Sequence, residues 1–335
     1  MAASVPRPPI DSPPCQAYCF ESPPRSVRRT FTLSFKIVPL FGLVAFSITS
    51  AACTLSTDGG VGERYVSTER TTASDEGSFA GERITVSSTG GSVEVVGVPG
   101  RTNIRVRAWL VAGARSAADA DAAFRDVTEQ LSVTRQGGAW LVSCSEARET
   151  HGSAGRSTTG CDRLRVEVPA GSVEAPIDLQ VRTSFGGVHA SGLVVKALDL
   201  EAPFGVKADV TPVTGARLRL WGEDLVSGHC STELRVPSTT AFKSAELRVQ
   251  NTEIRYAGVS ETDPEYALGA AIDGFPGAPS LPPRAAFYRW TRPAAGPTVD
   301  VELRASLGRA VLTSDPIAPF DPMTMCKKIE VDTRR

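Results

Sequence analysis

The residue types with the most chemistry in this chain are its seven cysteines and three histidines. Cys144 and Cys161 flank a 16-residue loop, rich in Ser, Gly, Thr and Arg, between two strand-like runs. A disulfide at the base of this loop would stabilise the fold by about 3 kcal/mol, because it restricts the unfolded chain. Cys230 and Cys326 are the other cysteines downstream of residue 53, and by elimination they form a second expected disulfide.

A metal site is the alternative use of these side chains, with Cys230, the adjacent His229 and a second histidine as ligands. No C-x-x-C or H-x-x-x-H spacing supports it, and thiols of exported proteins tend to oxidise. His151 and His189 are not accompanied by a nucleophile motif, because the sequence contains no G-x-S-x-G, H-E-x-x-H or S-x-x-K. All three histidines are therefore interpreted as surface or turn residues.

Asp178 and Asp199 are the acidic residues most open to a catalytic interpretation, because each precedes a leucine in a strand-like run. Two carboxylates in a groove could act on a polysaccharide, since glycoside hydrolysis uses such a pair. The favoured interpretation is that both cap strands or form ion pairs at strand edges. The sequence therefore predicts no catalytic residue, no metal and no cofactor, and an exported polysaccharide-acting enzyme remains the alternative function.

A further cysteine, Cys53, stands at the end of an export signal. Residues 25–52 combine a basic flank, an apolar run that begins at Ile37, and small residues at the end. The run is short for a transmembrane helix, which needs about 20 residues. The stretch Ser50-Ala51-Ala52-Cys53 resembles the lipobox of bacterial lipoproteins, in which the cysteine is acylated, although Ser50 stands where an aliphatic residue is usual. The resemblance implies a lipid anchor in the bacterial cell envelope, at the outer membrane or facing the periplasm, and simple secretion is the alternative.

The segments on either side of this signal lack apolar periodicity. Residues 1–24 are rich in Pro and Ser and are expected to be disordered or to precede the true start. Residues 53–82 are predicted to form a flexible tether, with a strand around Tyr65-Val66 as the alternative. Loss of residues 1–52 removes five basic and two acidic residues, which leaves 31 basic against 35 acidic and a net charge of −4. This balance disfavours nucleic acid as a partner and leaves the membrane, an envelope protein or a polysaccharide.

Short strands are the elements expected to position these residues. A low aromatic content, with 30 Gly and 24 Pro, fits a β-protein with many tight turns. Residues 83–160 form a first β unit, in which period-2 alternation predicts strands and Gly137-Gly138 predicts a hairpin turn. Residues 116–131 of this unit form the one convincing helix. Ser116 caps it, and four residues make its apolar stripe: Ala120, Phe124, Val127 and Leu131.

Residues 161–335 form the predicted β-repeat body. Pro169 and Pro237 lie 68 residues apart, and each is followed ten residues later by a leucine that opens a strand. The turn glycine advances by 19 from Gly186 to Gly205, which is close to the rung length of a β-solenoid. Four stretches share one plan of strand, Gly turn and short strand: 86–97, 181–192, 202–212 and 303–314.

The segments VRTSFGGVHASG and LDLEAPFGVKADV, within residues 160–260, resemble a broad family of bacterial envelope proteins with adhesin-type β-repeat domains of unknown function. The resemblance implies an all-β fold, a β-solenoid or β-roll with one packed helix, and no catalytic residues. A β-sandwich is the alternative, because the helix and a Pro-rich excursion at residues 264–297 depart from a plain solenoid. The expected function is non-enzymatic: adhesion, scaffolding or partner binding. Four residues of the excursion either anchor it or form a binding loop: Phe287, Tyr288, Arg289 and Trp290.

Overall fold

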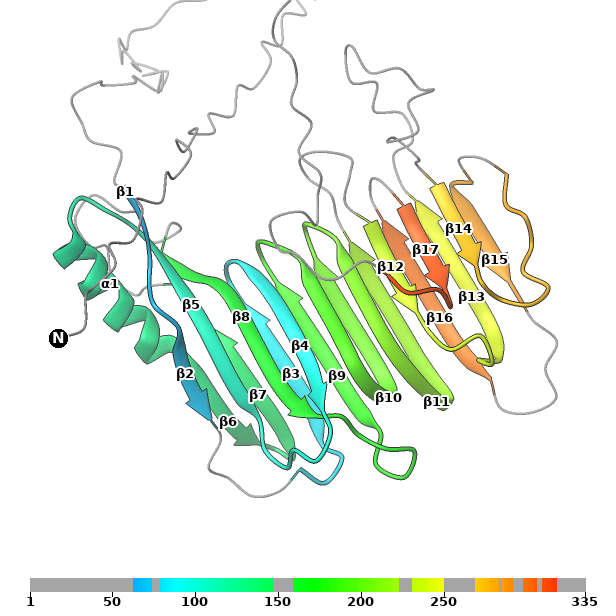
Figure 1. Cartoon of the computed structure of the whole chain (residues 1–335), viewed down its shortest axis with the longest axis horizontal. Coiled ribbons are helices and arrows are strands. Elements are labelled where there is room, and N and C mark those ends of the chain that lie inside the picture. Colours follow the sequence, from blue (N-terminus) through cyan, green and yellow to red (C-terminus); the bar gives the residue numbers. More distant parts are fainter. Residues whose placement is uncertain are drawn as a thin grey trace, which may run out of the picture. The chain divides into compact units, whose positions relative to one another are not determined.

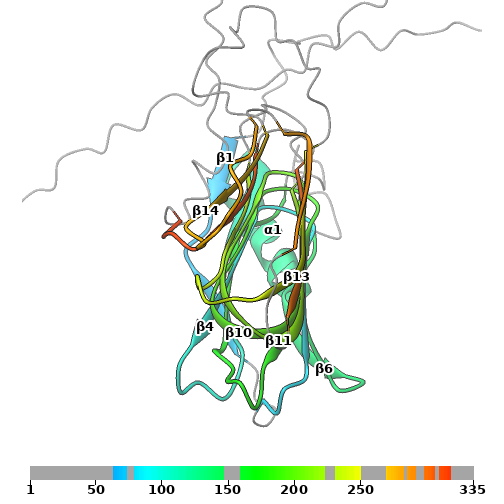
Figure 2. The same ribbon diagram turned by 90° about the vertical axis from the view of Figure 1, so that its right-hand side faces the viewer.

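The computed structural model describes eight stretches of the chain: residues 63–73, 79–146, 159–222, 231–249, 269–282, 285–291, 298–305 and 309–317. Within them the chain is mostly strands with a single helix, so the predicted all-β class is confirmed (Figure 1). The strands form one sheet that curls back on itself, so that two layers face each other (Figure 2). No helix in these stretches has the length and apolar character needed to span a membrane.

Layer 1 is antiparallel at one edge and parallel elsewhere. Its members in spatial order are β1 (Glu63–Val66) and β2 (Arg70–Ala73), then β5 (Arg105–Ala114), β8 (Gly160–Pro169), β4 (Ser92–Val98), residues 188–191 of β10 (Val188–Ala202), residues 206–209 of β11 (Val206–Gly222), β12 (Ser231–Arg235), β17 (Arg309–Thr313) and β14 (Gly269–Asp273).

Layer 2 is antiparallel at both edges and parallel between them. Its members in spatial order are β6 (Ser132–Gln136), β7 (Ala139–Cys144), β3 (Arg83–Ser88), β9 (Ile177–Thr183), residues 197–202 of β10, residues 217–222 of β11, β16 (Val299–Ala305), β13 (Phe242–Val249) and β15 (Phe287–Trp290).

A strand of layer 2 that passes over into a strand of layer 1 makes one rung of a β-solenoid. The long strands β10 and β11 each complete one rung in layer 1, bend, and begin the next in layer 2. At the layer-crossing turns, the backbone N–H of Phe204 donates to the carbonyl of Gly186 over 3.1 Å. The predicted 19-residue advance is therefore one rung. In spatial order the rungs are β7–β8, β3–β4, β9–β10, β10–β11, β11–β12, β16–β17 and β13–β14.

The spatial order of the rungs differs from their order in the chain. The first rung in sequence, β3–β4, lies between β7–β8 and β9–β10. The last rung in sequence, β16–β17, lies between β11–β12 and β13–β14. Each of these two rungs is therefore hydrogen-bonded on both sides.

The core lies between the two layers and is built from the inward-facing half of each strand. Strand β5 alternates half-buried and buried residues over its whole length, which is the period-2 pattern of a strand with one face inward. The core side chains are mainly Val, Leu, Ile and Ala, and the largest fully buried ones are Trp140 and Phe242. Burial of a Leu or Val side chain contributes about 1.5–3 kcal/mol. Many such side chains therefore stabilise the stack with few aromatic residues.

The layer-crossing turns depend on glycine at the point where two rungs touch. Gly186 has a φ of 99°, in the left-handed region. A Cβ at this position would lie 2.3 Å from the carbonyl oxygen of Gly91 in the neighbouring turn. Both the backbone angle and the close approach exclude a side chain, so neighbouring rungs can stack here only through glycine.

Helix α1 (Ala117–Gln130) lies beside β5 at one end of the stack (Figure 1). The Ser116 hydroxyl accepts a hydrogen bond from the backbone N–H of Asp119 over 3.2 Å, which is the predicted N-terminal cap. The helix contacts β5 and β8 of layer 1 and β7 of layer 2. Its apolar stripe therefore covers the core at this end; the buried members are Ala120, Ala123, Phe124 and Val127.

Two predicted boundaries are corrected by the structure. The proposed flexible tether, residues 53–82, contains strands β1 and β2, which pair with β5. Backbone hydrogen bonds to β5 hold these two short strands although most of their residues are polar, and Tyr65 packs partly against the core. The boundary drawn after residue 160 falls inside β8, which pairs with β4 and β5, so the two predicted units share one sheet. Residues 1–52, with the predicted signal, lie outside the described residues.

Candidate functional site

The predicted disulfide between Cys144 and Cys161 is present. It joins the end of β7 in layer 2 to the start of β8 in layer 1, and both residues are buried. The bridge therefore ties the two layers together at the base of the loop between them. Five of the residues singled out in the sequence lie outside the described residues: Cys53, His151, His229, Cys230 and Cys326.

The four residues of the predicted binding loop form strand β15. Trp290 is only 7% exposed and packs against Phe242 and Phe275, with ring centroids 5.2 and 5.7 Å away. Phe287 at the other end of the strand is 54% exposed and lies under the guanidinium of Arg248 at 5.2 Å. The strand is thus anchored by Trp290, and Phe287 is its exposed aromatic side chain.

His189 lies on the outer face of layer 1, in register with Glu94 of β4 and Lys207 of β11. Its side chain is largely covered, and burial lowers the pKa of His189 to about 4. The imidazole is therefore neutral near neutral pH. Within the part of the chain that the structure describes, no group of three His, Cys, Asp or Glu side chains is arranged to hold a metal ion.

The outer face of layer 2 contains a groove of about 560 Å³ that crosses β3, β9, β10, β11, β16 and β13. Outward-facing side chains of successive rungs line it, because the parallel register repeats the same orientation in each strand. Its arginines are Arg83, Arg217, Arg219 and Arg248. Its carboxylates are Asp178, Asp199, Glu246, Asp300 and Glu302.

The groove carboxylates form ion pairs with neighbouring cations. Asp178 pairs with Arg83 over 3.1 Å, and Asp199 pairs with Arg219 over 2.7 Å. The two acidic residues singled out in the sequence therefore form separate ion pairs, as expected, rather than a catalytic pair. The remaining pairs are Glu302 with Arg304, Glu246 with Arg248 and Arg289, and Asp300 with Lys243.

The charge state of Glu246 argues against this residue as a general acid. Hydrogen bonds from Arg289 hold the pKa of Glu246 below its usual value, with Arg248 adding to the effect. A general acid of a glycosidase needs a raised pKa, so that its carboxyl group is protonated. Glu246 is thus suited to recognition of charge rather than to proton donation, and Glu302 is its neighbour in register on β16.

One cation of the groove is available to a ligand. Arg217 is exposed and lies in register between Ala197 of β10 and Asp300 of β16. It makes no hydrogen bond or ion pair with a residue that the structure describes. Four residues further along β11, the Trp221 ring is covered by the guanidiniums of Arg219 and Arg304, at 4.5 and 4.4 Å from the ring centroid.

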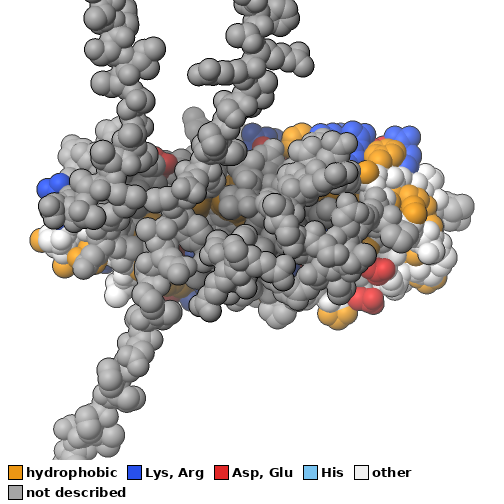
Figure 3. Space-filling model, turned by 90° about the horizontal axis from the view of Figure 1, so that it is seen from above, with side chains coloured by type: hydrophobic (Ala, Val, Ile, Leu, Met, Phe, Trp, Pro, Cys, Tyr) orange, Lys and Arg blue, Asp and Glu red, His pale blue; other side chains and the backbone are white. Residues whose placement is uncertain are grey.

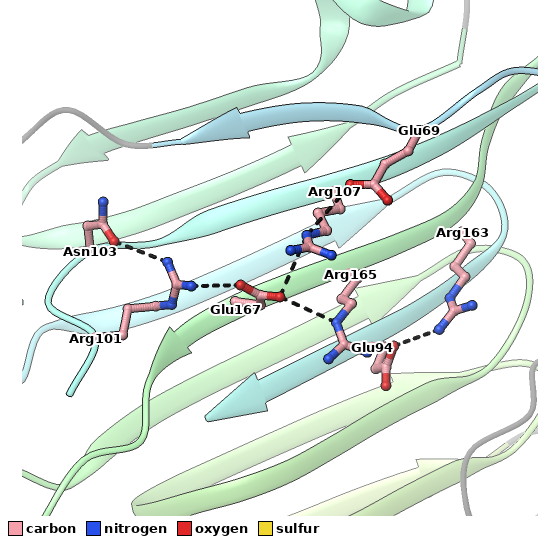
Figure 4. A network of polar contacts seen from close by, with 8 residues as sticks. All are labelled: Glu69, Glu94, Arg101, Asn103, Arg107, Arg163, Arg165 and Glu167. Carbon is pink, nitrogen blue, oxygen red and sulfur yellow. Dashed lines mark hydrogen bonds and ion pairs between the residues drawn. The ribbon is translucent and has the colours of Figure 1, made fainter. Parts of the chain in front are cut away.

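A second charged cluster lies on the outer face of layer 1, on the opposite side of the core (Figure 4). Glu167 accepts a hydrogen bond from Arg101 over 2.8 Å and lies 3.6 Å from both Arg107 and Arg165. Figure 4 shows three guanidiniums converging on this carboxylate: that of Arg107 from β5, that of Arg165 from β8 itself, and that of Arg101 from the turn before β5. Glu167 is only 7% exposed, so its carboxylate lies beneath the guanidiniums and fixes their positions.

Glu94 has the same role one strand further on. It accepts hydrogen bonds from Arg163 over 2.9 Å and from Arg165 over 3.1 Å, and it is 9% exposed. Arg163 also lies over the Trp109 ring, 5.0 Å from its centroid. The two glutamates thus fix arginines from β5, from β8 and from the turn before β5, and these side chains together form an arginine plate: Arg101, Arg107, Arg163 and Arg165.

Sequence reasoning missed this arginine plate, although a signal was present. Alternate arginines occur twice, in RVRAW from Arg105 and in RLRVEV from Arg163, and alternation places both members of each pair on one face of a strand. What local patterns did not reveal is the antiparallel pairing of β5 with β8, which sets Arg107 beside Arg165.

Comparisons with known proteins give weak likenesses. No protein-family model matches the chain, and no curated protein resembles it significantly. A solved structure of a putative cell adhesion protein from Clostridium sporogenes is 10% identical, with a TM-score of 0.42, and the match covers 73% of this chain and 98% of that one. A putative adhesin from Bacteroides fragilis is 9% identical, with a TM-score of 0.22 and coverages of 73% and 96%. Likenesses at this level assign neither a family nor a function.

Proposed function

We propose that this chain is an exported binding protein of the bacterial cell envelope, lipid-anchored at Cys53, with a non-enzymatic role in adhesion or scaffolding. The observation that carries the proposal is the charged groove of layer 2, which crosses six strands and is open to an extended ligand. The disulfide between Cys144 and Cys161 supports export, because disulfides persist in oxidising compartments. The signal-like residues 25–52 and the lipobox-like Ser50 to Cys53 support the anchor.

The groove suits a chain-like partner because its lining repeats with the rungs. Neighbouring strands lie about 4.8 Å apart, so a ligand along the stack meets a new side chain at that interval. Half-exposed ion pairs contribute at most about 1 kcal/mol each to stability, so they are not needed to hold the strands together. Their fixed guanidiniums and carboxylates can instead bind a polysaccharide or a segment of an envelope protein.

A polysaccharide-acting enzyme is the second candidate, and one observation favours it. Glu246 and Glu302 are neighbours in register on the floor of the groove, which provides the two carboxylates that glycoside hydrolysis uses. Against it, both carboxylates are bonded to arginines and the pKa of Glu246 is lowered. Release of reducing sugars that is lost in E246Q and in E302Q would favour the enzyme over the binding protein.

Binding through the groove is tested with a charge reversal at its free cation. The mature protein is assayed against immobilised acidic and neutral polysaccharides and against envelope fractions. Arg217→Glu is expected to weaken binding about tenfold, because it places a repulsive charge in the groove. Arg309→Glu is the matched control, since Arg309 is an exposed arginine on β17 of layer 1. Equal loss in both variants would reject the groove as the binding site.

The lipid anchor is tested separately by mass spectrometry of the mature N-terminal peptide. We expect a peptide that begins at Cys53 and carries acyl chains. An unmodified Cys53 at the mature N-terminus would support the alternative, a secreted protein with the same binding domain.

A further inference from the structure

The length of chain between Cys53 and the first described strand limits how far layer 1 can lie from the proposed anchor. Glu63, the first residue of β1, lies ten positions after Cys53, and ten extended residues span at most about 35 Å. Strand β1 pairs with the last residues of β5. If Cys53 is acylated, the edge formed by β1 and β5 is thus held within that distance of the membrane surface.

The outer face next to this edge has an excess of positive charge. Five arginines lie on or beside β5 and β8, against four carboxylates: Arg101, Arg105, Arg107, Arg163 and Arg165, with Glu69, Glu94, Asp162 and Glu167. Two of the glutamates are buried, whereas the guanidiniums of the ion-paired arginines remain partly exposed. Arg105 makes no hydrogen bond or ion pair with a described residue. The face is therefore cationic toward solvent.

An apolar fringe adjoins these arginines on the side nearest β1. Val66 of β1 is 51% exposed and lies directly opposite the half-buried Val111 of β5. Trp109 lies two residues before Val111 on the same face of β5, under the guanidinium of Arg163. The space-filling view from above shows hydrophobic side chains at the surface at both ends of the stack (Figure 3). At the β1 end, apolar and cationic side chains thus share one surface.

We propose that this surface docks on the membrane that holds Cys53, with its arginines binding the phosphate groups of anionic lipid headgroups. This inference rests on the proposed lipid anchor. The planar guanidinium matches the geometry of a phosphate group, and the buried glutamates hold several guanidiniums in place before binding. Val66 and Trp109 enter the interfacial region, where a Trp ring is favoured.

The docked orientation has a consequence for the groove. The arginine surface is the outer face of layer 1, and the groove is on the outer face of layer 2, with the core between them. A protein that lies on the membrane through layer 1 turns layer 2 away from it. The groove is then presented to a partner outside the anchoring membrane.

The docking is tested in the full chain carrying Cys53→Ala, which cannot be acylated. We measure cosedimentation with vesicles of phosphatidylcholine alone and of phosphatidylcholine mixed with phosphatidylglycerol. Binding is expected only to the mixed vesicles, and added salt should weaken it. An exposed basic residue near an anionic surface is worth about fivefold in affinity, so R105E with R163E should reduce binding about 25-fold or more.

Two further variants keep this test decisive. Arg182→Glu with Lys243→Glu makes the same change of charge at exposed positions on layer 2 and is expected to bind as before. Arg105→Gln with Arg163→Gln avoids repulsion between a new carboxylate and Glu94, and should bind weakly while its melting temperature stays near that of the parent.

Three outcomes overturn the inference. The first is equal vesicle binding by the two charge-reversed pairs, and the second is equal binding of the parent to both kinds of vesicle. The third is that the parent does not bind vesicles but binds a soluble uronic-acid polysaccharide, and that reversal of the charges at Arg105 and Arg163 abolishes this binding. None of these affects the acylation of Cys53, which mass spectrometry of the wild-type chain reports independently.

Discussion

The two ends of the stack cover the same kind of exposed core by different means. At one end the outermost rung is β7–β8, and at the other it is β13–β14. An end rung of a solenoid has no neighbour on one side, so its core and its unpaired backbone groups need a cover. Among the described residues, the β7–β8 end is covered by a disulfide, a helix and antiparallel strands, whereas the β13–β14 end is covered by one antiparallel strand and an aromatic cluster.

At the β7–β8 end, the cover is covalent and helical. Cys144 and Cys161 join the two layers, and the buried side chains of α1 fill the space between them. Strand β5 pairs with β8 in layer 1, and β6 pairs with β7 in layer 2. Each layer thus ends in an antiparallel strand.

At the β13–β14 end, the cover is apolar packing. Strand β15 pairs with β13, and the rings of Phe242, Phe275 and Trp290 pack against one another. This end is therefore closed by packing of large side chains, whereas the closure of the other end includes a bond that persists in an oxidising compartment.

Trp290→Ala should have the largest effect on this comparison. Removal of a buried Trp costs about 3–5 kcal/mol of the free energy of unfolding, because it leaves a cavity beside Phe242 and Phe275. Denaturant unfolding measures the loss, and hydrogen exchange should show it concentrated in β13 to β15. Phe287→Ala is the control on the same strand, and its exposed ring should be worth under about 0.5 kcal/mol. Equal losses in the two variants would mean that the aromatic cluster does not close this end.

Cys144→Ala with Cys161→Ala should weaken the opposite end. The loss of the bridge is expected to cost about 3 kcal/mol of unfolding free energy, because the unfolded chain regains the entropy of an open loop. Hydrogen exchange should become faster in β7 and β8 and stay unchanged in β13 and β15. A cost below about 1 kcal/mol would show that the helix and β5 close this end without the bond.

His189 lies between the two ends of the stack, and its titration should make the stability of the protein depend on pH. Burial lowers its pKa to about 4, below the value of about 6.5 in an unfolded chain. As the pH falls from about 6.5 to 4, the unfolded state takes up the proton first, so stability decreases in that window by at most about 3 kcal/mol and no further below it. His189→Gln lacks this decrease. Unfolding curves of both proteins across this window, with identical pH dependence, would contradict the prediction.

Ser116→Ala should have the smallest of these effects. The hydroxyl of Ser116 accepts the Asp119 N–H, and loss of such a cap costs about 1 kcal/mol. Denaturant unfolding of this variant is compared with that of Glu129→Ala, an exposed substitution in the same helix that should change stability by less than about 0.5 kcal/mol. A cap effect no larger than the control would mean that packing alone holds the helix at this end.

Local patterns in the sequence predicted the elements of this fold well. Period-2 alternation, a serine before an apolar stripe, and paired glycines depend only on neighbouring residues, so the strands, helix α1 and the Gly137-Gly138 hairpin were found where expected. The 19-residue advance from Gly186 to Gly205 predicted the rung, and the loop between Cys144 and Cys161 predicted the disulfide. Strands β1 and β2 lie in the segment for which a flexible tether was the favoured prediction. Their side chains lack a clear apolar alternation, and they are strands because their backbones pair with β5.

Tertiary structure alone decided the order of the rungs and the surfaces that result from it. Parallel pairing joins segments far apart in the chain, such as β3 with β9, and their similar Val and Leu patterns would allow other orders. The choice depends on how all rungs and end covers pack together, which no local window contains. For the same reason, the arginine plate forms only when β5, β8 and β4 lie side by side in layer 1. The groove likewise forms only when β9, β11 and β16 lie in layer 2.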